Sequence, residues 1–408
     1  MPLPDPSGEH RVGVFEADIA APTMVGVIPC VVYYPAEDEE PLGTDFFCGV
    51  GGGRGGGTAK PPLKWLEPAY ASALGRSHLT NTLGRWTAET LMSSMGPAAT
   101  AYETVRAAVD APAKTPPAGG WPCAIFSHSM TGWRHVNSSF CAEIASHGAV
   151  AIHVEHCDGT ACLARARDDG RVLADYVSWE HDKTEELKAL HGPDAEDEIK
   201  ADLAAWRRGQ LDARLVELAA ALDGLDGAAL EAGIGAGLPF ARTSDDVAVL
   251  GQSFGGAAAA AMCARDDART PRFSRCLVYD PWFDGAGDER YPLAAADYAG
   301  AFPGVKTAAI WRNGTSPLSE TCAANWDAFL DKAGPAGRAY DHPHAGHFAQ
   351  TDAPCVFERG PLSFVYNALV DAADGQDAAT QLAAALEETV EALGADWFAA
   401  GATGPADA

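Results

Sequence analysis

Basic residues are scarce in this sequence. Its 408 residues include 29 lysines and arginines against 56 aspartates and glutamates, and the formal net charge is −27. A surface of this sign repels phosphate backbones and anionic lipid headgroups. Binding to nucleic acid is therefore excluded as a leading function, whereas contact with a zwitterionic lipid is not.

Metal-binding spacings are also missing. The ten cysteines are scattered, and none forms a CxxC pair or a Cys/His set with zinc spacing. Several of them stand in apolar runs, where a thiol behaves as a small buried hydrophobe. We therefore expect reduced core thiols, no metal and no cofactor.

Targeting and membrane signals are absent from the sequence as well. The first ten residues contain no basic segment followed by an apolar one, and position 2 is Pro2 rather than a glycine that could be myristoylated. No run approaches the roughly 20 apolar residues of a transmembrane helix. These absences favour a cytoplasmic protein with no transmembrane segment.

The chain has enough apolar residues, 47%, for a large core, and the pattern of apolar and polar residues changes along its length. The first segment with strand character covers residues 25–34, and residues 49–60 are glycine-rich without the Gly-Lys-Ser/Thr of a phosphate-binding loop. We predict a flexible loop at 49–60, one domain over residues 1–400 and a disordered tail at 401–408.

From Trp121 onward, short apolar strands alternate with amphipathic helices, which is typical of a mostly parallel sheet flanked by helices. The expected strands are 123–127, 149–155, 247–251, 276–280 and 307–311. The expected helices are 136–146, 186–190, 196–222, 256–264, 320–332 and 381–393. Residues 175–235 are predicted to form a helical insertion between two sheet strands.

One motif carries most of the chemistry. Residues 246–258 (DVAVLGQSFGGAA) run from an apolar strand through Gly-x-Ser-x-Gly into an alanine-rich helix. This is the context of the nucleophile elbow of the α/β-hydrolase fold, in which the neighbours of a strained serine must be small. The following helix also favours developing negative charge at its N-terminus. We therefore predict an α/β-hydrolase with Ser253 as its nucleophile.

A serine hydroxyl needs a base, and the base needs an orienting acid, in the chain order Ser, Asp, His. The strand after the elbow ends at Asp280, which we take as the acid. The histidines beyond it are His342, His344 and His347, and spacing alone favours His347 over His344 without deciding between them.

An oxyanion hole needs two backbone N–H donors. Phe254, the residue after the nucleophile, supplies one, and the loop after strand 123–127 places Met130 or a neighbour as the other. The aromatic residues Trp133 and Trp282 and the nearby His128 are candidates for the substrate pocket, although core packing explains such aromatics equally well.

Several blocks together resemble the platelet-activating-factor acetylhydrolases of the plasma and type II intracellular kind. Residues 126–129 (FSHS), 145–148 (ASHG), 154–158 (VEHCD) and 251–256 (GQSFGG) are similar to the family's F-S-H-G, A-S-H-G, V-E-H-R-D and G-H-S-F-G-G. Residues 33–35 (YYP) and 280–282 (DPW) resemble its early Y-Y-P and its D-x-W acid turn. The resemblance spans about residues 25–364, with the blocks in the family's order.

The resemblance implies Ser253 as nucleophile, Asp280 as acid, and Phe254 with Met130 as oxyanion donors. It also implies His347 as base, because residues 347–352 (HFAQTD) fit the family's H-x-x-[FQ]-[AS]-D except at the threonine, whereas His344 does not. Further departures are a glutamine at 252 beside the nucleophile, a cysteine at 157 in the V-E-H-R-D block, and a serine at 129 where the family has a glycine suited to an unusual backbone conformation.

The implied activity is calcium-independent hydrolysis of the short sn-2 ester of platelet-activating-factor-like or oxidised phospholipids. A general carboxylesterase, or a polyester or dienelactone hydrolase, would carry the same motifs, and a hydrolase-fold binding protein without catalysis is an alternative of another class. Segments 63–66 and 83–95 are amphipathic enough for transient contact with a lipid surface, but equally for packing on the core.

Overall fold

The computed structural model describes residues 3–23, 25–38, 63–79, 90, 107–231, 247–265, 273–283, 302, 304–357 and 377–399. The predicted loop at 49–60 and the predicted tail at 401–408 lie outside these residues, as does segment 83–95 apart from Thr90.

Within the described residues, a nine-stranded sheet has the order β11-β10-β9-β8-β4-β5-β2-β1-β3. Its strands are β1 (Val12–Ala20), β2 (Val27–Pro35), β3 (Ala108–Val109), β4 (Cys123–Ser127), β5 (Val150–Val154), β8 (Val247–Gln252), β9 (Arg275–Tyr279), β10 (Thr307–Asn313) and β11 (Gly337–His342). In this order, each neighbouring pair from β11 through β10, β9, β8 and β4 to β5 is parallel, and β2 pairs antiparallel with both β5 and β1. This is the α/β-hydrolase fold that the sequence predicts.

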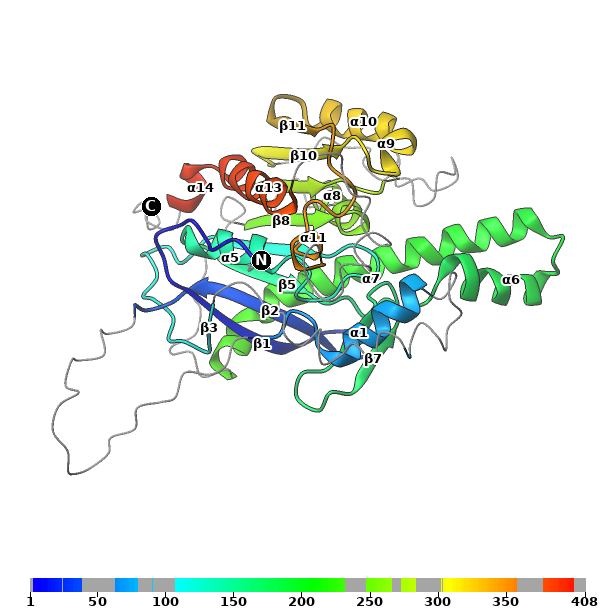
Figure 1. The fold of residues 1–408 in the computed structure, drawn as a ribbon, viewed down its shortest axis with the longest axis horizontal. Coiled ribbons are helices and arrows are strands. Elements are labelled where there is room, and N and C mark those ends of the chain that lie inside the picture. Colours follow the sequence, from blue (N-terminus) through cyan, green and yellow to red (C-terminus); the bar gives the residue numbers. More distant parts are fainter. Residues whose placement is uncertain are drawn as a thin grey trace.

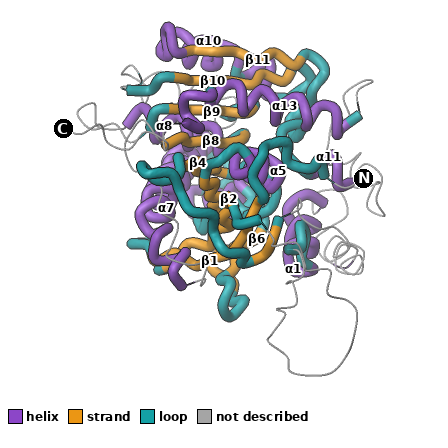
Figure 2. Tube along the Cα trace, turned by 90° about the vertical axis from the view of Figure 1, so that its left-hand side faces the viewer, coloured by secondary structure: helices purple, strands orange, loops and turns teal. Residues whose placement is uncertain are grey.

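Helices cover both faces of the sheet (Figure 2). One face carries α1 (Pro68–Leu74), α5 (Ser138–Ser146), α11 (Ala353–Phe357), α13 (Ala378–Leu393) and α14 (Ala395–Ala399). The other carries α7 (Glu196–Glu231), α8 (Phe254–Arg265) and α10 (Ala323–Ala333), the last preceded by the single turn α9 (Leu318–Thr321). The chain also forms the shorter helical segments η1 (Gly75–Leu79), η2 (Trp179–Lys183) and η4 (Gly334–Ala336).

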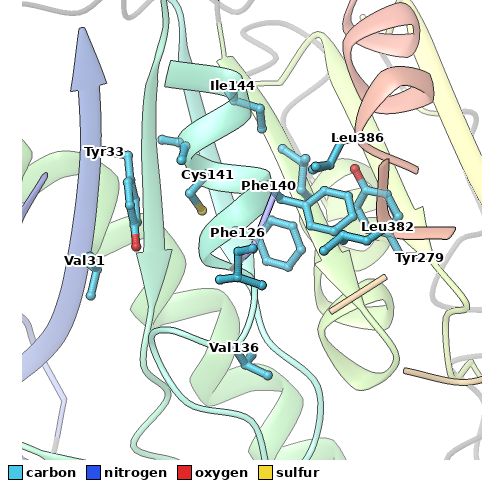
Figure 3. Close-up of a cluster of buried hydrophobic side chains, with 14 of the residues drawn as sticks. Val31, Tyr33, Phe126, Val136, Phe140, Cys141, Ile144, Tyr279, Leu382 and Leu386 are labelled. Carbon is cyan, nitrogen blue, oxygen red and sulfur yellow. The ribbon is translucent and has the colours of Figure 1, made fainter. Parts of the chain in front are cut away.

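Alternation along each strand divides the core into two layers. In β4, for example, Phe126 points to the α5 side while Ile125 points to the α8 side. On the α5 side, Phe126, Phe140 and Tyr279 form a ring cluster with centroids 5.0–6.0 Å apart, which α13 covers with Leu382 and neighbouring residues (Figure 3). A sheet buried on both faces explains why its central strands are almost uniformly apolar.

The segment between β5 and β8 contains a small hairpin and two helices. The hairpin pairs β6 (Leu163–Arg165) with β7 (Val172–Asp175), and α6 (Thr184–His191) folds back on the N-terminal part of α7 through Leu187, Ile199 and Leu203. This pair of helices extends away from the sheet, whereas the remainder of α7 packs beside β1 and α8 (Figure 1). Both helices lie within residues 175–235, the segment that the sequence predicts to be a helical insertion. That this segment is an insertion stays a prediction.

Strands β1, β3, β6, β7 and β11 were not expected, and β1 and β11 are the longest of them. β1 precedes residues 25–34, which we took as the first strand, and it carries Gly13, Glu16 and Asp18 among its apolar residues. β11 is a polar edge strand, GRAYDH, whose residues are at least partly exposed. An edge strand with one wet face needs no apolar run, so composition alone does not mark it.

Segment 63–66 packs on the core, since Trp65 and Leu66 are both fully buried. The structure therefore selects core packing over lipid contact for these residues. The described cysteines are free thiols, all buried except the half-buried Cys157.

The interior of β5 holds a histidine that is forced to stay neutral. His153 is fully buried, stacks on Phe126 with ring centroids 5.2 Å apart, and lies 3.3 Å from Asn137 Oδ1 through its Nε2. Burial, together with electrostatic repulsion from the nearby His135, lowers the pKa of His153 to about 3.

This lowered pKa predicts acid sensitivity. Between about pH 6.5, where a histidine in the unfolded chain titrates, and pH 3, the unfolded state holds one more proton at this position than the folded state. Stability is therefore lost as the pH falls through this window. We expect His153→Gln to reduce the pH slope of the unfolding free energy by up to about one proton, measured by denaturant titration from pH 7 to 4. Equal slopes for His153→Gln and wild type would contradict the assignment.

Candidate active site

Ser253 occupies a strained turn between β8 and α8. Its φ is 57°, in the left-handed region that few non-glycine residues adopt. The Ser253 N–H donates to the Tyr279 carbonyl at 2.9 Å, and the Ser253 carbonyl accepts from the Trp282 N–H at 3.0 Å. Both neighbouring segments thus fix the serine from its backbone, and its residue surface is 4% exposed.

The glycines around Ser253 are required by close backbone packing. A Cβ at Gly251 would lie 2.0 Å from the Gly255 carbonyl oxygen, and a Cβ at Gly255 would lie 2.0 Å from the Ser127 carbonyl oxygen. A Cβ at Gly256 would lie 2.8 Å from the Cβ of Pro281. The glycines of the Gly-x-Ser-x-Gly-Gly motif are therefore explained by three close contacts that leave no room for a side chain.

The structure brings Ser253, His347 and Asp280 together. His347 Nε2 lies 2.9 Å from Ser253 Oγ, and His347 Nδ1 lies 2.5 Å from Asp280 Oδ2. The Asp280 side chain is fully buried, while the His347 side chain is 16% exposed. The three residues follow β8, β9 and β11, whose carboxyl ends meet at one edge of the sheet.

Asp280 is held by residues that the sequence analysis did not single out. Its φ is 41°, and its N–H donates to the Trp311 carbonyl at 2.8 Å. Ser316 Oγ donates to Asp280 Oδ2 at 2.5 Å, and the Asn313 N–H lies 3.4 Å from Oδ1. Asn313 and Ser316 end β10 or follow it directly, so their place after a parallel strand is the signal that could have identified them.

The loop that carries His347 is fixed by amide side chains. Gln252, which stands where the family has histidine, donates through Nε2 to the His347 carbonyl at 2.8 Å. Asn313 Nδ2 donates to the Gly346 carbonyl at 2.8 Å and pairs with Gln350. The other two candidate bases lie elsewhere: His342 Nε2 is 2.9 Å from Glu388 Oε2, and His344 is exposed.

Asp352, the last residue of the HFAQTD block, supports the fold and does not contact Ser253, His347 or Asp280 in the hydrogen bonds that it makes. Asp352 is fully buried, where it accepts from Ser138 Oγ, the Ser139 N–H and Trp65 Nε1. It thus satisfies the first turn of α5, and burial raises its pKa to about 6.

The two predicted oxyanion donors lie in adjoining segments. Phe254 is the first residue of α8, and Met130 lies in the loop after β4, against which Gly255 packs. Neither backbone N–H donates a hydrogen bond to another described residue. The left-handed residue of this loop is Thr131, with φ 58°, whereas Ser129 does not have a positive φ. Serine at 129 therefore introduces no backbone strain of the kind that the family's glycine would relieve.

The three pocket candidates have different surroundings. Trp282 lies beside Phe254, with ring centroids 6.2 Å apart, and packs in the same cluster as Met130. Trp133 instead contacts Trp65 on the α5 side, with ring centroids 4.7 Å apart. His128 is fully buried and neutral, since its Nδ1 donates to the Ser129 carbonyl and its Nε2 accepts from the His156 N–H. Trp282 is thus the candidate whose ring packs beside Phe254, one of the two proposed oxyanion donors.

The described residues contain no group of three or more histidine, cysteine or carboxylate side chains arranged to hold a metal ion. Nor does any helix among them combine the length and apolar character that a membrane crossing requires.

Comparison with known proteins identifies related sequences. The family model for platelet-activating factor acetylhydrolase, isoform II, matches residues 68–296. A putative phospholipase A2 of Schizosaccharomyces pombe is 46% identical over 50 residues, which are 12% of this chain and 11% of that protein. The platelet-activating factor acetylhydrolase of Bos taurus is 29% identical over 187 residues, 42% of this chain and 37% of that protein. The matches therefore span less than two fifths of the length of either relative.

Among solved structures, a ferulic acid esterase from Streptomyces cinnamoneus superposes with a TM-score of 0.56 at 15% identity, covering 98% of this chain and 92% of that one. Fold and site together thus define an α/β-hydrolase in which a serine, a histidine and an aspartate lie in hydrogen-bonding succession. Since the family model matches more than half of the sequence, the chain belongs to the platelet-activating factor acetylhydrolase, isoform II, family.

The close approach at Gly255 predicts opposite effects for two glycine substitutions. Gly255→Ala should destabilise the protein by about 1–3 kcal/mol, because the new methyl group would displace the loop after β4. Gly209→Ala, on the exposed face of α7 with open space around its Cα, should stabilise it by about 0.5–1 kcal/mol. Denaturant unfolding of both variants measures this, and destabilisation of equal size in the two would refute the argument.

Proposed function

We propose that the protein is a serine-dependent carboxylic ester hydrolase in which Ser253 is the nucleophile, His347 the base and Asp280 the orienting acid. The observation that carries the proposal is the succession of contacts from Ser253 Oγ to His347 Nε2 and from His347 Nδ1 to Asp280. A serine hydroxyl is unreactive unless its proton has a place to go, and this arrangement supplies one.

The geometry supports the following reaction. Ser253 Oγ attacks the ester carbonyl carbon while His347 Nε2 takes the hydroxyl proton, and the buried Asp280 stabilises the imidazolium and holds its orientation. The tetrahedral intermediate collapses as His347 returns the proton to the leaving alcohol. A water molecule, deprotonated by the same histidine, then attacks the acyl-enzyme carbonyl. The second tetrahedral intermediate collapses by breaking its bond to Ser253 Oγ, which takes the proton back from His347, and the free acid leaves.

The negative charge of each tetrahedral intermediate needs donors that are already in place. We assign the N–H groups of Phe254 and Met130 to this role, since they come from segments that pack directly against each other. Donors fixed before the reaction need no reorganisation, and removing one from a serine hydrolase costs about 100- to 1,000-fold in kcat.

For the substrate we propose a phospholipid with a short or oxidised sn-2 acyl chain, such as an acetylated glycerophosphocholine. Membership of the family and the names of its relatives support this class. The net charge of −27 also suits a zwitterionic phosphocholine better than an anionic lipid. Phe254 and Trp282 provide apolar surface beside the nucleophile, and the assigned groups perform the reaction without calcium.

Hydrolysis by wild type and Ser253→Ala tests the proposal. We expect wild type to release the sn-2 acid from acetyl-glycerophosphocholine faster than from a long-acyl analogue, in buffer containing EDTA. Ser253→Ala should lower the rate by about 10⁴-fold or more, because no other group can form the acyl-enzyme.

Ser178→Ala, in the segment before α6, is the matched control and should retain wild-type rates. Wild type that cleaves short p-nitrophenyl esters but no phospholipid would favour a general carboxylesterase. Equal ester hydrolysis by Ser253→Ala and wild type would reject the nucleophile, and no hydrolysis by wild type would favour a binding protein.

A further inference from the structure

The insertion helix α7 places a buried ion pair beneath the loop that carries Met130. Arg214 and Asp158 are both fully buried at the side chain, and Arg214 Nε lies 3.1 Å from Asp158 Oδ2. Asp158 is the last residue of the VEHCD block, just after β5. A buried charge pair of this kind carries a large desolvation cost, so a gain in stability is a weak explanation for it. The role of the pair is therefore better explained by its other contacts.

The other contacts of Arg214 indicate this role. Its Nη1 donates to the His128 carbonyl at 2.6 Å and to Ser127 Oγ at 3.2 Å, and its Nη2 donates to Thr160 Oγ1. Thr160 in turn accepts at its carbonyl from the Thr131 N–H at 2.7 Å. Arg214 therefore fixes the loop after β4 on both sides of Met130.

The same guanidinium also contacts the second oxyanion segment. Its central carbon lies 4.7 Å from the centroid of the Phe254 ring, within the range of a cation–π interaction. One side chain thus touches both of the segments whose N–H groups we assign to the oxyanion hole. Lysine could not replace these contacts, because it presents a single charged nitrogen rather than a planar fork of five N–H donors.

A second set of buried residues supports the same loop. Ser127 Oγ lies 2.8 Å from His156 Nε2, and His156 Nδ1 lies 2.7 Å from Glu217 Oε2. The succession resembles a catalytic triad, but the three residues are at most 2% exposed, so no substrate reaches them. Glu217 also accepts from the Cys157 N–H at 3.0 Å, and the His156 N–H donates to His128.

The protonation states of this second set are consistent with support rather than chemistry. Burial lowers the pKa of His156 well below its ordinary value and raises that of Glu217 well above it. A neutral Glu217 that donates to His156 Nδ1 lets His156 Nε2 donate to Ser127, whose oxygen also accepts from Arg214. Each hydrogen bond then has one donor and one acceptor.

From these contacts we infer that Arg214 is a positioning residue for the oxyanion hole: paired with Asp158, it holds the His128 carbonyl and the Phe254 ring so that the Met130 and Phe254 N–H groups converge on the reacting ester. The inference rests on the proposed function. It assigns a role to α7, which contributes none of the three residues Ser253, His347 and Asp280.

The test separates positioning from folding by counting working sites. Wild type, Arg214→Lys and Asp158→Asn are titrated with a fluorophosphonate to give the concentration of active sites, and p-nitrophenyl butyrate hydrolysis is measured per titrated site. We expect kcat per site to fall about 10- to 100-fold in Arg214→Lys and less in Asp158→Asn, with KM changed less than threefold. The affinity for a trifluoromethyl ketone, which forms a tetrahedral oxyanion adduct, should fall in parallel with kcat/KM.

Arg208→Lys, on the exposed face of the same helix, is the matched control and should retain wild-type values. Unchanged kcat per site in either Arg214→Lys or Asp158→Asn, even if fewer sites titrate, would show a purely structural role and overturn the inference. If Arg214→Lys yields no folded protein, Asp158→Asn alone decides in the same way. Failure of the proposed function is distinct, since wild type itself would then neither hydrolyse the ester nor bind the ketone.

Discussion

The contact between Gly255 and the carbonyl oxygen of Ser127 is the constraint on which the rest of the site depends. It leaves no room for a Cβ, so the turn after β8 and the loop after β4 meet backbone to backbone. This approach places Ser253 at its left-handed φ, Phe254 at the N-terminus of α8, and the Met130 loop beside both. The hydrogen bond from the Ser253 N–H to Tyr279 then links the turn to β9, which ends at Asp280. A parallel sheet brings these segments to one edge, but the glycine contact sets their spacing.

The residues around this edge differ in how they are held. Asp280 and His347 are fixed by short side chains from neighbouring loops, chiefly Ser316, Asn313 and Gln252. The Met130 loop is fixed from below by the buried Arg214 of α7, whose ion pair with Asp158 carries a considerable desolvation cost. An insertion between two sheet strands can therefore control a site to which it contributes no reacting group. Substitutions in α7 would change the reaction without changing the residues that perform it.

Much of the fold was predictable from sequence, because the central strands are buried on both faces and read as apolar runs. The parallel strands β4, β5, β8, β9 and β10 were predicted to within a few residues of their bounds. β1 and β11 were missed because Glu16, Asp18 and the polar residues of β11 break the apolar pattern. Tertiary pairing, which the local pattern does not contain, determines both strands.

The site shows the same division. The glycines around Ser253 and the chain order of serine, aspartate and histidine could be identified in the sequence. The structure brings Ser253, Asp280 and His347 together. Arg214 and Glu217 were not predicted, since polar residues at helical spacing in α7 are indistinguishable in sequence from a solvated helix face. Trp133 illustrates the converse, because its nearness in sequence to Met130 does not determine on which side of the sheet its ring packs.

The central claim is that Ser253 is a nucleophile activated by His347. The most direct measurement is covalent trapping with a fluorophosphonate, followed by peptide mass spectrometry of wild type and His347→Asn. The account predicts one phosphonyl group per wild-type chain, located on Ser253, and a labelling rate at least about 100-fold lower in His347→Asn. Labelling at another residue, or at Ser253 with the same rate in both proteins, would contradict it.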